Sequence, residues 1–117
     1  MSTLRASVSA GEAGPLITLS GEADLTTVTE LSEVVTSQLS GGTLHLTIDA
    51  SGLSFADSAS LRVLLLAARI LTIRGGGLVL LRPQRALART MEIIAADQLI
   101  QIREGTDISP GAEREAG

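Results

Sequence analysis

Apolar and polar residues alternate in two short runs near the start of the chain, and a turn-forming segment separates them. Residues 5–9 and 16–20 show the period of two that is typical of strands with one buried face. Residues 11–15, Gly-Glu-Ala-Gly-Pro, have the composition of a turn. The pattern predicts a β-hairpin, and residues 21–24 are expected to break its second strand.

The pattern then changes to the helical period. Between Val28 and Leu39, apolar side chains recur at helical spacing and polar residues occupy the other face. A short oxygen side chain can accept hydrogen bonds from the free N–H groups of a first helical turn. Asp24 or Thr26 is therefore expected to cap this helix, and the glycine pair at 41–42 is expected to end it.

Two further strand–helix units follow. Residues 44–49 alternate as in a strand, and residues 50–57 are expected to form a loop. Residues 58–73 predict a helix that is apolar almost all round, as expected of a helix that is nearly buried or covered by a partner. Glycines at 75–77 end that helix, and the apolar run at 78–81 predicts an interior strand.

The last part of the chain repeats the arrangement. Pro83 fits the start of a third helix, and residues 99–102 predict a final strand. The inner face of this helix is expected to be formed by Leu87, Met91, Ile94 and Ala95. Strands that alternate with helices imply parallel pairing through crossover connections.

The combined pattern predicts an α/β fold with one domain over residues 1–103. Its mixed sheet would contain the N-terminal hairpin and the parallel strands, with helices packed mainly on one face. Residues 104–117 are rich in Gly, Ala and Glu, and predict a disordered C-terminal tail.

Composition narrows the classes of function. Hydrophobic residues make up 44% of the 117 residues, which is enough for one core. The chain has no Cys, which excludes disulfides and thiolate metal sites. A net charge of -4 and a single aromatic residue, Phe55, argue against binding to nucleic acid or an anionic membrane. Without a signal peptide or an apolar run of ~20 residues, the protein is expected to be cytoplasmic.

Other candidate chemistry is weak. His45 is the only His and has no matched Ser or Asp partner in the sequence. Asp49 follows a predicted strand, but the chain has no Lys for response-regulator chemistry. The glycines at 75–77 follow a helix and precede no phosphate-binding motif. No cluster has the spacing of metal ligands. We therefore expect no enzymatic activity and no cofactor.

Asp57 and Ser58 stand where a loop meets the predicted helix at 58–73. The N-terminus of a helix exposes unpaired N–H groups and a partial positive charge. Either side chain can cap the helix. The hydroxyl of Ser58 is also suited to accept a phosphoryl group, because the helix dipole offsets part of the added charge of about -1.5 to -2.

One stripe of the same helix combines charge and apolar surface. Arg62, Leu66, Arg69 and Ile73 fall within a narrow arc, with Leu65 beside it. An apolar stripe between two arginines suits a docking surface. The alternative is that the leucines belong to the core and the arginines extend along its edge.

Three segments, in this order, resemble the signatures of STAS domains. Residues 19–24 are similar to that family's Gly-Glu-x-Asp turn. Residues 44–64 resemble its strand and loop leading to Asp-Ser-(Ser/Thr)-Gly-Leu, here Asp-Ser-Ala-Ser-Leu at 57–61. Residues 90–100 look like its last helix. The resemblance covers about residues 5–103.

The resemblance implies an anti-sigma factor antagonist that acts by partner switching in bacterial transcription regulation. Such an antagonist, when unphosphorylated, binds an anti-sigma factor that is also a serine kinase. The kinase supplies ATP and Mg2+ and phosphorylates the Ser after the motif Asp, and a PP2C-type phosphatase reverses this. The expected state is a monomer or a transient heterodimer with the kinase.

By position, Ser58 would be the phosphoacceptor. Partner contacts would come from Asp24, Asp57, Ser58, Arg62, Leu65, Leu66 and Arg69. Two departures stand in the motif, since Ala59 and Ser60 occupy places where the family commonly has Ser or Thr and then Gly. Ser60 is therefore an alternative acceptor. The alternative function is an unswitched STAS scaffold subunit in a larger signalling or lipid-transport complex.

Overall fold

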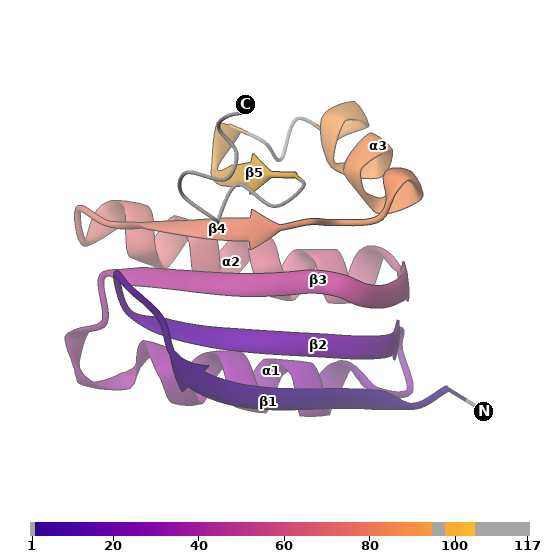
Figure 1. Ribbon diagram of the computed structural model, residues 1–117, viewed down its shortest axis with the longest axis horizontal. Coiled ribbons are helices and arrows are strands. Elements are labelled where there is room, and N and C mark those ends of the chain that lie inside the picture. Colours follow the sequence, from indigo (N-terminus) through magenta and orange to yellow (C-terminus); the bar gives the residue numbers. More distant parts are fainter. Residues whose placement is uncertain (1, 95–97, 105–117) are drawn as a thin grey trace.

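The computed structural model describes residues 2–94 and 98–104 of the chain (Figure 1). One five-stranded sheet has the order β1-β2-β3-β4-β5. Its strands are β1 (Leu4–Ala10), β2 (Pro15–Ala23), β3 (His45–Ala56), β4 (Gly77–Leu81) and β5 (Ile100–Arg103). The helices are α1 (Val28–Leu39), α2 (Ser58–Ile73) and α3 (Arg85–Ile93), with a short 3-10 turn, Ser40–Gly42, after α1. β1 and β2 pair antiparallel and the other neighbours pair parallel, which confirms the predicted mixed sheet.

The core lies between one face of the sheet and the helices. Figure 1 shows α1 and α2 behind the sheet, and α3 near the β4–β5 edge. Alternate strand residues point into this layer, so that Ile17, Ile48 and Leu80 are fully buried. α3 contributes Leu87 and Met91 to the same cluster. Each buried side chain of this size contributes about 1.5–3 kcal/mol relative to its exposed state.

β2 and β3 extend beyond the ends that the sequence pattern predicts. Residues 21–24 were expected to break β2 and residues 50–57 to form a loop, but β2 continues to Ala23 and β3 to Ala56. Their added segments pair with each other, and two register shifts interrupt the alternation. Leu53 in this extension is buried. The expectation was wrong because the bulges interrupt the alternation of apolar and polar residues that identifies a strand, and the segment consists largely of small and polar residues.

Gly21 occupies the bulge of β2 where β1 begins. Its φ of +99° lies in the region that side chains with a Cβ disfavour. A Cβ at this position would stand 2.1 Å from the carbonyl oxygen of Thr3. That oxygen accepts a hydrogen bond from the N–H of Glu22 at 2.9 Å. The chain needs glycine here for the two strands to meet.

An ion pair joins the interior of β3 to the residue that follows β4. The guanidinium of Arg82 donates to Asp49 Oδ2 at 2.6 Å, and the backbone N–H of Ser51 donates to Oδ1 at 3.0 Å. Burial acts to raise the pKa of Asp49. The hydrogen bonds from Ser51 and the charge of Arg82 outweigh it, so the pKa is lowered overall. Asp49 therefore has a structural partner.

Several predicted element ends differ from the structure. Neither Asp24 nor Thr26 caps α1, because the N-cap is Thr27 and its side chain makes no capping hydrogen bond. α3 begins at Arg85, two residues after Pro83. Ile94, expected on the inner face of α3, is exposed. Ala95 and residues 105–117 of the predicted tail lie outside the described residues.

Candidate functional site

The predicted motif residues meet where β2 and β3 end. Ala23 pairs with Ala56 in the last register position of the two strands. The backbone N–H of Asp57 then donates to the carbonyl of Ala23 at 3.0 Å. This bond fastens the start of α2 to the end of β2. It brings Asp24 and Asp57, which are far apart in the sequence, to the same edge of the sheet.

Asp57, and not Ser58, caps α2. Its Oδ1 accepts from the N–H of Ser60 at 3.0 Å, and its carbonyl accepts from the N–H of Leu61 at 2.9 Å. Asp57 has the extended backbone that N-cap residues prefer. Ser58 is consequently the first residue of the helix, and its side chain is exposed. Since Asp57 does the capping, the hydroxyl of Ser58 is left for other chemistry.

Ser60 does not suit the role of alternative phosphoacceptor. It is 0% exposed and lies under the first turn of α2. Its Oγ has no hydrogen-bond partner among the described residues. A kinase would reach this hydroxyl only after local unfolding of the helix, whereas Ser58 is accessible in the folded protein.

We expect Ser60→Ala to stabilise the protein by about 1 kcal/mol. A buried hydroxyl without a partner costs roughly 1–3 kcal/mol of desolvation, and Ala removes the polar atom while it leaves most of the packing intact. Urea unfolding of the two proteins measures the difference in the free energy of unfolding. Ser58→Ala is the control at an exposed position of the same turn, where a change within about 0.5 kcal/mol is expected. A lower stability for Ser60→Ala would show that the hydroxyl is satisfied.

Asp24 is held by the residues around it. Its carboxylate accepts hydrogen bonds from the hydroxyls of Ser2 and Thr26, and from the backbone N–H of Thr26 at 2.9 Å. The hydroxyl of Ser2, followed by that of Thr26, holds the pKa of Asp24 below its ordinary value. Asp24 thus organises the turn after β2 and carries a negative charge beside the start of α2.

The outer stripe of α2 is exposed as a docking surface requires. Arg62 and Arg69 are exposed, and Leu66 between them is 52% exposed. Leu65 is half-buried and packs against the core, so its placement fits the alternative interpretation better. Ile70 and Ile73, also exposed, continue the stripe toward the C-terminal end of the helix.

Two exposed apolar residues that the sequence analysis did not select flank the start of α2. Leu25 follows Asp24 and is 74% exposed, and Phe55 precedes Asp57 by two residues and is 52% exposed. Large apolar side chains at such exposure are typical of interfaces when they gather. The position of the only aromatic residue beside the motif was the signal available in the sequence. We call Leu25, Phe55, Arg62, Leu66 and Arg69 the docking surface.

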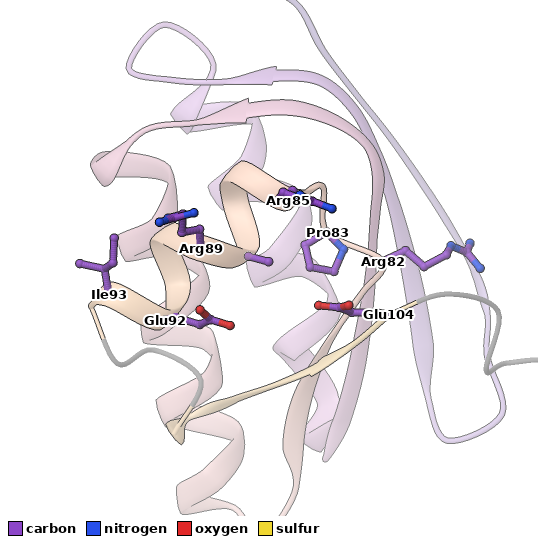
Figure 2. Close-up of a pocket in the computed structure, with 8 residues that line it drawn as sticks. Arg82, Pro83, Arg85, Arg89, Glu92, Ile93 and Glu104 are labelled. Carbon is purple, nitrogen blue, oxygen red and sulfur yellow. The ribbon is translucent and has the colours of Figure 1, made fainter.

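A cleft lies elsewhere, between α3 and the ends of β4 and β5. Figure 2 shows its lining, which includes Arg85, Arg89 and Glu92 from α3 and Glu104 after β5. Its volume is about 790 Å3. Both signs of charge line it, and none of the predicted site residues belongs to it. The segments that follow its walls, residues 95–97 and 105–117, lie outside the described residues.

Within residues 2–94 and 98–104, no group of three or more His, Cys, Asp or Glu side chains could hold a metal ion. In the same part of the chain, no helix has the length and apolar character needed to cross a membrane.

Comparisons with known proteins agree with this geometry. The family model described as "Mlab, STAS domain" matches residues 6–101. An anti-sigma-B factor antagonist of Staphylococcus aureus (strain NCTC 8325 / PS 47) is 28% identical over 92 residues, which are 79% of this chain and 85% of that protein.

Solved structures show the same fold. The crystal structure of an anti-sigma factor antagonist from Mycobacterium paratuberculosis has a TM-score of 0.81 at 20% identity, over 96% of this chain and 95% of that one. The Bacillus cell fate determinant SpoIIAA in its phosphorylated form has a TM-score of 0.69 at 18% identity, over 89% of this chain and 96% of that one. At these identities, the likeness extends to the fold.

Proposed function

The chain belongs to the STAS domain family, and from that membership we propose that it is an anti-sigma factor antagonist whose partner binding depends on the state of Ser58. The relative from Staphylococcus aureus carries the name of this function, and SpoIIAA has been solved in a phosphorylated form. In the proposed role the protein is regulatory. Its partner is an anti-sigma factor with serine kinase activity, and a PP2C-type phosphatase restores the unphosphorylated form.

The observation that carries this proposal is the exposed hydroxyl of Ser58 at the capped start of α2. Asp57 satisfies the helix end, so Ser58 can react without loss of a structural hydrogen bond. In the transfer step, Ser58 Oγ forms a bond to the γ-phosphorus of ATP in the kinase. The bond from that phosphorus to ADP breaks, ADP leaves, and the hydroxyl proton passes to a base of the kinase or to water.

The charge of the product explains the release of the partner. Phosphorylation adds about -1.5 to -2 charges at neutral pH. The added charge lies next to Asp57 and on the same sheet edge as Asp24. A partner that fits the unmodified surface would then have to desolvate a dense cluster of negative charge, which opposes binding. The kinase would dissociate from the antagonist and bind its sigma factor again.

The first test is capture of the partner from a lysate of the native cells. We expect immobilised unphosphorylated protein to retain a protein with a kinase-type ATP-binding domain that also binds a sigma factor. Leu66→Ser should retain about tenfold less of it, because the substitution removes the exposed apolar side chain between the two arginines of the docking surface. Mass spectrometry identifies the retained protein and its amount.

Ile93→Ser is the matched control. Ile93 is also an exposed apolar residue, but it lies on α3 beside the cleft, away from the docking surface. The Ile93→Ser protein should retain as much of the partner as the protein without a substitution. Equal retention by the Leu66→Ser protein would place the interface elsewhere, and retention of a complex without a kinase would contradict the proposed function.

A further inference from the structure

We propose that Arg62 binds the phosphate of phosphorylated Ser58 within α2, so that phosphorylation withdraws this guanidinium from the docking surface. The inference rests on the proposed function, because it requires that Ser58 is the residue modified. It adds a second effect of the modification. The phosphate brings negative charge, and it also occupies a positive group that the unmodified protein offers to its partner.

The helix places the two residues together. Ser58 is the first residue of α2 and Arg62 follows four positions later, and both are exposed. Residues at this spacing lie on one helix face with Cβ atoms about 5–6 Å apart. An acidic group toward the N-terminus and a basic group toward the C-terminus is the favourable order for such a pair. A long Arg side chain spans the gap to a phosphate and can bind it through two N–H groups.

The guanidinium of Arg62 has no carboxylate partner within the described part of the chain. The ion pair found within residues 2–94 and 98–104 joins Arg82 to Asp49, and Arg62 takes part in none there. Arg74, by contrast, is held by the carbonyls of Leu39 and Thr43 at 2.8 and 2.9 Å. The guanidinium of Arg62 therefore gains a partner without giving one up.

Several acidic residues lie at the same end of the sheet as the start of α2. Asp57 precedes Ser58, Glu22 and Asp24 lie at the end of β2, and Glu30 is in the first turn of α1. They would raise the pKa of the phosphate. Arg62 would lower the pKa of the phosphate. The next arginine on the stripe, Arg69, is eleven residues from Ser58, about 16 Å along the helix, and is too far away to have a similar effect. A single substitution therefore separates the effect of Arg62 from the rest.

The test uses the full-length protein with phosphoserine incorporated at position 58 during translation, so that no kinase is needed. Phosphorus NMR follows the second pKa of the phosphate, which is about 6 for phosphoserine. We expect Arg62→Gln to raise this pKa by about half a unit, a roughly threefold change in proton affinity. Arg69→Gln is the matched control with the same loss of charge, and it should leave the pKa within about 0.1 unit.

The same titration in concentrated urea provides the folded-state check, because the difference between the two proteins should largely vanish once the helix is lost. Equal phosphate pKa values in folded wild-type and Arg62→Gln proteins would overturn the inference. This result does not depend on any partner. If Arg62 lowers the phosphate pKa but phosphorylation leaves partner binding unchanged, the pair exists and the proposed function fails.

Discussion

Replacing Ser58 by Asp is expected to weaken binding of the anti-sigma partner by at least ~100-fold, or about 2.7 kcal/mol. The carboxylate stands in for part of the phosphate charge, next to Asp57 and on the same sheet edge as Asp24. Like charges brought together in an interface cost several kcal/mol. Titration calorimetry with the purified partner measures the dissociation constant.

Loss of the fold would not explain this result. An acidic residue in the first turn of a helix interacts favourably with the helix dipole, so Ser58→Asp should fold as well as the unmodified protein. Ser58→Asn is the matched control, because it has the shape of Asp without its charge. Ser58→Asn and Ser58→Ala should both bind within a few-fold of wild type. Equal affinities for the Asp and Asn proteins would instead support an unswitched STAS scaffold.

Replacing Gly21 by Ala is expected to lower the free energy of unfolding by about 3 kcal/mol or more. Two costs combine at this position. The backbone has a φ of +99°, and the new Cβ would stand 2.1 Å from the carbonyl oxygen of Thr3. Strain of this kind costs about 1–2 kcal/mol, and a forced backbone shift roughly 1–3 kcal/mol more. Urea unfolding measures the loss.

Gly41→Ala separates the two costs. Gly41 also has a positive φ, +79°, but a Cβ there would meet no atom within 4 Å. We expect it to lose only about 1–2 kcal/mol. If Gly21→Ala were no more harmful than Gly41→Ala, the start of β1 would be free to move. In that case the contact of Ser2 with Asp24 would contribute little to the order of this edge.

The fold followed from the sequence wherever the periodicity was clear. The strict alternation at 44–49 and the helical spacing from Val28 to Leu39 each matched an observed element. The pattern did not reveal the paired extensions of β2 and β3. Local composition favoured a loop at 50–57, but pairing with β2 supplies the hydrogen bonds that make a strand, and bulges change which residues point inward.

The candidate site was predicted less completely than the fold. The motif located Asp57 and Ser58, but the sequence could not decide which of them caps α2, since both side chains are able to. Ser60 is unsuited as the phosphoacceptor because it is buried, and burial depends on which residues pack over that turn of the helix. The exposure of Leu25 and Phe55 also depends on the fold, and the position of Phe55 beside the motif was the one signal for it in the sequence.

The hydrogen bond between Asp57 and Ala23 bears on how a cell would use such a switch. The start of α2 is tied to the sheet, and Asp57 already closes the helix end. A phosphate on Ser58 would then leave the backbone at the start of α2 in place, and only nearby side chains such as Arg62 would move. The signal would then be the fraction of molecules that carry the phosphate. The ratio of kinase to phosphatase activity would set this fraction, and the amount of active sigma factor would follow it in a graded way.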